Sequence, residues 1–259
     1  MYGIRHSRMG MAAGAGEFLA SDYGDVMAWW DADDTDSVTT SGSAVTDWAA
    51  IEWNATQHTA SQGTAANQPE YQYDSGINRY YIAFDGAAWL DAANSADWTL
   101  ASGYAMFVAF SRAAGTSPMA FFSHFKPTSP FQGFEIMTGN LAATAVGTGE
   151  FGHWDGSTWK DQNGITDLND TNWHIGYAYT DGASNTFIGT DGRDGDSHSI
   201  SSITSNTQVL RIGADTNTAI TRRLNGNIGE IIIYRSVLNT SQREAVVNYL
   251  SEKWGVTQV

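Results

Sequence analysis

The chain has 259 residues, enough for one large domain, and its 28 Asp and Glu against 13 Lys and Arg give a formal charge of −15. This charge disfavours nucleic acid as a partner, because phosphates are bound by basic surfaces. The sequence contains no cysteine, which excludes a disulfide framework, a thiolate nucleophile and Cys-ligated zinc.

Residues 1–24 are dominated by Gly, Ala, Met and Arg and follow neither the strand nor the helix periodicity. We expect an N-terminal arm that is either disordered or becomes ordered against another subunit. Glu17 interrupts the apolar run that a signal peptide would need, so cleavage of this segment is disfavoured. The residues expected to contact a partner are Arg5, Arg8, Met9, Met11 and Phe18.

The stretch WWDADDTD, residues 29–36, places two tryptophans directly before four carboxylates. The first interpretation is a joint of the fold, in which Trp30 packs inward while Asp31 and Asp34 accept backbone N–H bonds in the following turn. A Ca²⁺ site is the alternative, although the spacing departs from an EF-hand loop. A catalytic carboxylate pair is the third interpretation. The residues concerned are Asp31, Asp33, Asp34 and Asp36.

From residue 25 onward, short alternating segments predict β-strands. In YAMFVAFS, residues 104–111, bulky side chains at every second position alternate with smaller ones. In NWHIGYAYTDG, residues 172–182, Trp173 shares one face with Ile175, and Asp-Gly supplies a turn. Other predicted strands lie within 79–86, 118–125, 131–139, 185–192, 210–215 and 228–237. No helix is predicted between them, which indicates two packed antiparallel sheets.

The segment EFGHWDGSTWKDQNG, residues 150–164, brings two tryptophans into an otherwise polar stretch. They either staple a β-hairpin by cross-strand packing or form an aromatic platform for a sugar. The residues of the predicted platform are His153, Trp154, Asp155 and Trp159. A second polar stretch, GTDGRDGDSH at 189–198, is interpreted as a turn in preference to a cation site.

One segment near the end of the sequence, residues 240–254, has apolar residues at helical spacing. Asn239 with Gln242 resembles a capping box, and Gly255 is a typical C-terminal stop. We predict a single amphipathic helix that packs on the sandwich through Val247, Leu250 and Trp254. No run approaches the roughly 18 apolar residues of a membrane-spanning helix.

The order of these segments resembles that of laminin-G-like, concanavalin A-like jelly-roll domains. FDGAAWLDAA, NWHIGYAYTDGASNTFIGTDGRDG and the closing LRIGADTNTAITRRLNGNIGEIIIYRSVLNTSQREAVVNYLSEKWG carry the resemblance, together with the opening MAWWDADDTDSV. The likeness covers about residue 25 to the end. It implies an all-β, two-sheet antiparallel jelly-roll sandwich with one C-terminal α-helix, spanning 25–259 behind the arm at 1–24.

The resemblance extends to domains of bacteriophage tail, head-fibre and capsid-decoration proteins, which display a lectin-like domain. It implies a non-enzymatic virion protein at the particle surface, present in many copies or as a homo-oligomer. Other virion proteins would bind the arm, and host-surface glycans would bind the domain. A free carbohydrate-binding lectin and a glycoside hydrolase of the same fold are the alternatives, but no catalytic carboxylate motif is found. No cofactor is expected other than the alternative Ca²⁺.

Overall fold

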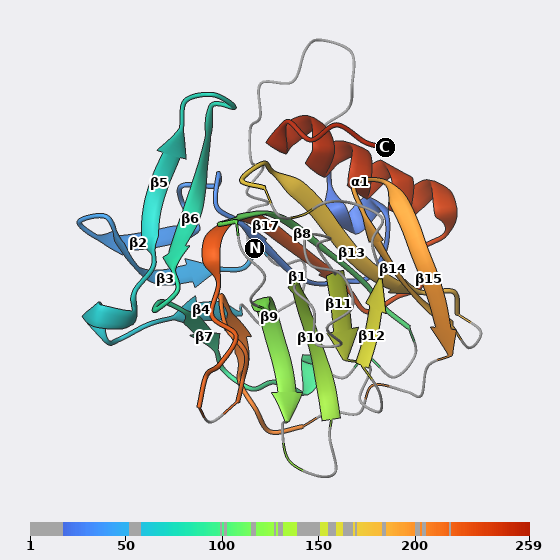
Figure 1. Cartoon of the computed structure of the whole chain (residues 1–259), viewed down its shortest axis with the longest axis horizontal. Helices are drawn as coiled ribbons and strands as arrows, with labels where there is room; N and C mark the ends of the chain where they lie inside the picture. The colour runs from blue at the N-terminus through green and yellow to red at the C-terminus, as the bar shows by residue number, and fades with distance from the viewer. Residues whose placement is uncertain are drawn as a thin grey trace, which may run out of the picture.

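The computed structural model describes residues 18–51, 58–98, 100, 103–114, 118–126, 128, 132–138, 151–154, 159–162, 168, 170–182, 185–199, 203, 206–217 and 219–259, with the backbone alone at 151–154, 159–162, 196 and 198. Within these ranges the strands pair antiparallel and pack as a jelly-roll sandwich with one long helix (Figure 1). The predicted fold class is confirmed.

The helix-covered sheet is built around β17 (Asn225–Tyr234), the longest strand. One edge of β17 pairs with β8 (Ala105–Arg112), and the other pairs first with β6 (Arg79–Asp85) and then with β1 (Val26–Asp31). The strands that extend this sheet are β13 (His174–Thr180), β14 (Asn185–Thr190) and β15 (Arg193–Ser199) beyond β8, and β5 (Glu70–Asp74) beside β6.

The opposite sheet completes the sandwich. Its strands, in spatial order, are β2 (Val38–Ser41), β3 (Ala44–Ala49), β4 (Thr59–Ser61), β7 (Leu90–Ala92), β16 (Leu210–Ile212), β9 (Met119–Lys126), β10 (Gln132–Thr138), β11 (Phe151–Trp154) and β12 (Trp159–Gln162). A short 3-10 helix at Ala20–Asp22 precedes β1, and two others, at Ala65–Asn67 and Ala96–Trp98, connect strands.

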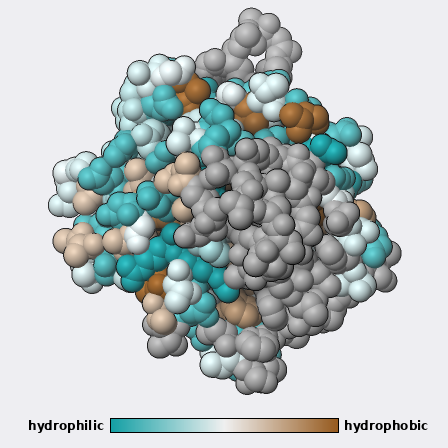
Figure 2. Space-filling model, in the orientation of Figure 1, coloured by the Kyte–Doolittle hydropathy of each residue, from teal (hydrophilic) through white to brown (hydrophobic). Residues whose placement is uncertain are grey.

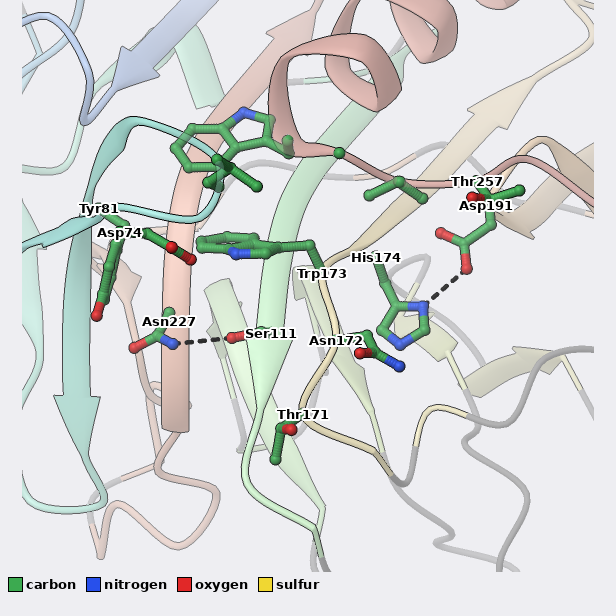
Figure 3. A pocket seen from close by; sticks show the side chains of 14 residues that line it. Asp74, Tyr81, Ser111, Thr171, Asn172, Trp173, His174, Asp191, Asn227 and Thr257 are labelled. Atoms are coloured by element: carbon green, nitrogen blue, oxygen red, sulfur yellow. Dashed lines mark hydrogen bonds and ion pairs between the residues drawn. The ribbon is translucent and has the colours of Figure 1, made fainter.

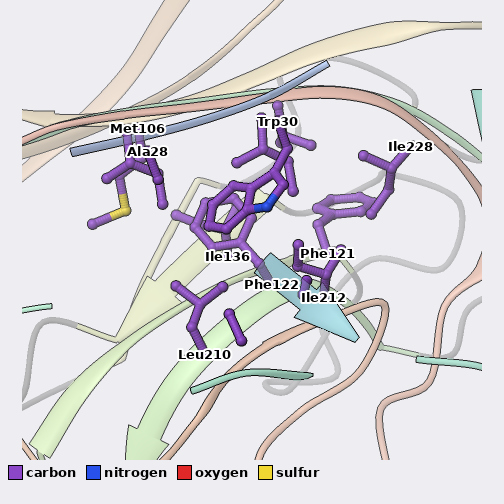
Figure 4. Close-up of a cluster of buried hydrophobic side chains, with 14 of the residues drawn as sticks. Ala28, Trp30, Met106, Phe121, Phe122, Ile136, Leu210, Ile212 and Ile228 are labelled. Atoms are coloured by element: carbon purple, nitrogen blue, oxygen red, sulfur yellow. The ribbon is translucent and has the colours of Figure 1, made fainter. Parts of the chain in front are cut away.

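Two apolar layers explain why both faces of β8 are buried. Met106, Val108 and Phe110 belong to the core cluster between the sheets. Figure 4 shows Met106 and Trp30 in this cluster. Phe107 faces the other way, toward the helix. The predicted alternation at 104–111 is therefore confirmed, and the smaller face is also buried because the helix covers it.

The helix α1 (Thr240–Trp254) lies across β13 and β8 (Figure 1). The Asn239 side chain accepts the Gln242 backbone N–H at 3.0 Å, the Gln242 side chain accepts the Asn239 N–H at 2.9 Å, and Gly255 ends the helix at φ 68°. Leu250 is fully buried in the layer beneath. The predicted helix, its caps and its docking are confirmed.

The exterior carries few large apolar side chains. Among the described residues these are Tyr73, Tyr80, Val237 and Val259. Figure 2 shows hydrophobic residues scattered singly between hydrophilic ones on the coloured part of that face. Within the described ranges, no helix has the length and apolar character needed to cross a bilayer.

Candidate functional site

A pocket of about 560 Å³ opens on the helix-covered sheet, beside the C-terminal end of α1 (Figure 3). Strands β6, β17, β8 and β13 contribute to it, together with the residues that follow the helix. Its lining residues are Asp74, Ile77, Tyr81, Ser111, Thr171, Asn172, Trp173, His174, Asp191, Asn227, Trp254, Gly255, Val256 and Thr257.

Three aromatic rings form one wall of the pocket. Trp173 lies directly before β13, and its ring centroid is 4.6 Å from that of Trp254, the last residue of α1. Tyr81 on β6 meets Trp173 edge-on at 5.8 Å. Trp254 is fully buried, whereas Trp173 and Tyr81 are half-buried and expose part of their rings. The wall is held in place from behind and presents an apolar surface of the kind that the ring face of a sugar contacts.

Polar groups lie beside this wall. The Asn227 Nδ2 donates to the Ser111 Oγ at 2.8 Å across β17 and β8 (Figure 3). The Asp74 Oδ1 accepts the Gly76 backbone N–H at 2.8 Å. Among the described residues, no partner is found for the Asn227 Oδ1 or the Asp74 Oδ2. Thr171 is exposed at the rim. These oxygens are available to sugar hydroxyls.

His174 lies at the pocket edge between two carboxylates. Its Nδ1 is 2.7 Å from the Asp191 Oδ2, and its Nε2 is 3.0 Å from the Asp170 Oδ1. Burial lowers the pKa of His174, but the hydrogen bonds and charges of the two aspartates outweigh burial and raise it above its ordinary value. Both ring nitrogens are occupied, so the imidazole has no open site to take a proton from a ligand.

Asp191 owes its position to a hairpin turn. Asp191 and Gly192 join β14 to β15 with φ of 52° and 85°, the two positive values that a two-residue turn requires. The Asp191 Oδ1 also accepts the Ile175 backbone N–H at 2.7 Å. The predicted Asp-Gly turn is confirmed at Asp191 and Gly192, whereas residues 193–198 belong to β15. The Asp191 carboxylate holds His174.

The first carboxylate of the acidic run is buried in a charged network. Asp31 is fully buried, and its Oδ2 is 2.7 Å from the Lys253 Nζ, which is also 2.8 Å from the Glu230 Oε2. Glu230 accepts the indole N–H groups of Trp29 at 2.7 Å and Trp254 at 3.2 Å. The network joins β1, β17 and α1, as a structural joint would.

The other three carboxylates diverge from Asp31. Asp33 accepts the Tyr80 backbone N–H at 3.0 Å and pairs with Arg79 at 3.5 Å. Asp34 accepts the Asp36 backbone N–H at 3.2 Å within the turn. No group of three or more metal-donating side chains occurs among the residues that the structure describes. These contacts fit the joint interpretation, and the Ca²⁺ alternative stays a prediction.

The predicted aromatic platform is described only in its backbone. Strands β11 and β12 pair as a hairpin in which Trp154 is opposite Trp159 and His153 is opposite Lys160. Asp155 lies outside the described residues. The register is the one that cross-strand packing of the tryptophans requires, and the choice between staple and platform stays a prediction.

The arm residues Arg5, Arg8, Met9 and Met11 also lie outside the described residues. Phe18 is described, and its ring stacks on Tyr249 of α1 with centroids 3.7 Å apart. Ala20, in the 3-10 helix that follows, is fully buried. Residues 18–24 therefore lie against the domain, and the partner contacts expected of the arm stay predictions.

Sequence reasoning missed the pocket itself. Trp173 was placed correctly on the face of Ile175, but nothing in the pattern joined it to Tyr81 or Asn227. Those two residues lie in distant segments that become neighbours only through strand pairing with β17. The one available signal was the WH pair at 173–174, which places an aromatic beside an ionisable group at the start of a strand.

Comparisons with known proteins show the fold. No family model matches the chain, and a search of curated proteins finds no match. Among solved structures, the binding domain of Paraclostridial Mosquitocidal Protein 1 is similar with a TM-score of 0.62 and 11% identity, covering 92% of this chain and 56% of that one. The chain thus spans little more than half of that structure.

Two further structures are similar. Domain 4 of an extracellular arabinanase from Geobacillus stearothermophilus, in complex with arabinotriose, has a TM-score of 0.57 and 13% identity, with 88% of this chain and 98% of that domain covered. The botulinum neurotoxin serotype D ligand-binding domain, in complex with N-acetylneuraminic acid, has a TM-score of 0.51 and 10% identity, with 83% and 54% covered. This chain has the jelly-roll β-sandwich fold of these binding domains.

Proposed function

We propose that this chain is a non-catalytic carbohydrate-binding domain and that its ligand occupies the pocket beside Trp173. The observation that carries the proposal is the aromatic wall of Trp173 and Tyr81 beside the open oxygens of Asn227 and Asp74. A sugar offers both an apolar ring face and hydroxyls, so it can contact the rings and the oxygens together.

The hydrogen-bond partners of the pocket carboxylates favour sugar binding over hydrolysis. Glycoside hydrolysis needs two carboxyl groups in defined roles. Of the two carboxylates that line the pocket, Asp191 is occupied by His174 and the Ile175 N–H, so only Asp74 has an open oxygen. The arabinanase domain, which is covered over nearly its whole length, adds support because its structure holds arabinotriose.

A glycan array followed by calorimetry tests the proposal. Trp173→Ala should weaken binding of any glycan found by at least about tenfold, the loss of about 1.4 kcal/mol expected of a central aromatic contact. Trp89→Ala serves as the matched control, because Trp89 is also half-buried but precedes β7 in the opposite sheet. Circular dichroism establishes that both variants fold. Equal binding by the two variants would contradict the proposal.

We propose further that the domain is displayed on a bacteriophage particle and attached through its arm. The resemblance to domains of bacteriophage tail, head-fibre and capsid-decoration proteins supports this proposal, as does the composition of residues 1–17. Phe18, the first described residue, stacks on Tyr249 of α1. Deleting residues 2–17 should leave the melting temperature unchanged and abolish incorporation into particles. Normal incorporation of the truncated chain would favour a free lectin.

A further inference from the structure

We infer that the pocket selects sugars by charge: it favours sugars with a protonated amine over neutral ones and rejects carboxylated sugars, with Asp74 as the residue that sets this order. The inference rests on the proposed function and concerns the same pocket.

The residues that line the pocket carry an excess of negative charge. Neither lysine nor arginine occurs among the described residues that line the pocket, whereas Asp74 and Asp191 both do. Recognition of a sugar carboxylate normally uses a guanidinium or ammonium group. The pocket offers no such group.

His174 does not supply the missing positive charge. Its two ring nitrogens are 2.7 Å and 3.0 Å from Asp191 and Asp170. Whether His174 is neutral or protonated, the group that it forms with two carboxylates carries a net negative charge, and its ring nitrogens contact those carboxylates instead of the pocket's open oxygens. An anionic ligand therefore meets repulsion here.

Two cations that adjoin the lining residues in sequence or in strand register are paired with carboxylates other than Asp74. Arg79 is opposite Asp74 in the β5–β6 register, but its Nε is 3.5 Å from the Asp33 Oδ2. Lys253 adjoins Trp254 in the sequence, but its Nζ is buried between Asp31 and Glu230. The printed ion pairs of both groups are thus with carboxylates outside the pocket.

Asp74 is placed to receive a cation. Its carboxylate lies at the edge of the Trp173 indole (Figure 3), and among the described residues only its Oδ1 has a partner, the Gly76 N–H. An ammonium group beside this carboxylate gains from its negative charge. A 2-amino sugar resting on the wall would bring its ammonium to the Asp74 carboxylate.

Matched sugars test the inference. Glucose, glucosamine and glucuronic acid, and the corresponding galactose series, are displayed at the same linkage on one array and titrated against the whole chain. We expect the amino sugar to bind most tightly and the uronic acid most weakly, with about tenfold or more between them. Asp74→Asn should reduce that ratio by about tenfold, while Asp22→Asn, an exposed carboxylate outside the pocket, should preserve it.

The outcomes separate this inference from the proposed function. If Trp173→Ala abolishes binding but the uronic acid binds as well as the amino sugar, the pocket binds sugars and the charge preference is wrong. If Asp74→Asn keeps the full preference, Asp74 does not set it. If a glycan on the wider array binds through Trp173 but none of the six sugars does, the charge preference is wrong and the proposed function stands. If no glycan binds, or binding is indifferent to Trp173→Ala, the proposed function fails and the inference with it.

Discussion

The Lys253 Nζ lies 2.7 Å from the Asp31 Oδ2, and both side chains are sealed from solvent. The pair joins the first strand of the domain to the end of its helix. Glu230 shares the same ammonium at 2.8 Å. Burial raises the pKa of Glu230 to about 7, although the positive charge of Lys253 acts in the opposite direction. Two carboxylates thus depend on one cation.

Replacing that cation should remove a large part of the protein's free energy of unfolding. Lys253→Met leaves Asp31 and Glu230 buried without a counter-charge, so the free energy of unfolding should fall by about 3–5 kcal/mol. Urea denaturation followed by fluorescence measures the change. Lys126→Met is the control, because Lys126 is half-exposed at the end of β9 and should change stability by less than about 0.5 kcal/mol. A small loss at Lys253 would mean that the network relaxes or admits water.

Truncating the helix core should be costly as well. Leu250 is fully buried between α1 and the sheet, so Leu250→Ala should lower the free energy of unfolding by about 2–5 kcal/mol. The exposed Glu252 on the same helix provides the control Glu252→Ala. If Leu250→Ala cost less than about 0.5 kcal/mol, the helix would not be docked in solution.

His174 should make stability depend on pH with a defined sign. Its pKa is raised in the folded state, because Asp191 and Asp170 outweigh the opposing effect of burial. Its contribution is therefore fully present below the ordinary histidine pKa of about 6.5 and is lost as pH rises through the raised value. The difference in unfolding free energy between wild type and His174→Gln should shrink as pH rises from acidic to alkaline.

His58 provides a control whose pKa is shifted in the opposite direction. Burial lowers the pKa of His58 more than Asp97 raises it. The contribution of His58 should therefore weaken as pH falls below about 6.5. Parallel pH profiles for His174→Gln and His58→Gln would contradict the assigned environments.

The two interpretations of the acidic residues 31–36 predict different effects of Ca²⁺ on stability. If residues 31–36 form a joint, excess chelator should leave the melting temperature unchanged, whereas bound Ca²⁺ would stabilise the fold by RT ln(1 + [L]/Kd). Differential scanning calorimetry with and without Ca²⁺ measures this. A Ca²⁺-dependent rise that disappears in the double variant Asp33→Ala, Asp36→Ala would establish the metal interpretation instead.

Local periodicity and capping chemistry were enough to predict much of the fold. The alternation at 104–111 predicted β8, and Asn239, Gln242 and Gly255 predicted the ends of α1. These signals depend on neighbours a few residues apart, because strand and helix geometry fix which of those side chains share a face. The Asp191-Gly192 turn was predictable for the same reason.

Tertiary structure alone decided the charged network and the pocket. The sequence predicted Asp31 as an acceptor in a turn, but only the docking of α1 places Lys253 beside it. The sequence placed Trp173 on a strand face, but only the packing of β6 and α1 brings Tyr81 and Trp254 to its ring. Such contacts join segments far apart in the chain, and their geometry follows from sheet register and helix docking. Side-chain periodicity carries no information about which distant segments meet, so the sequence determined the elements and the packed sandwich determined the site.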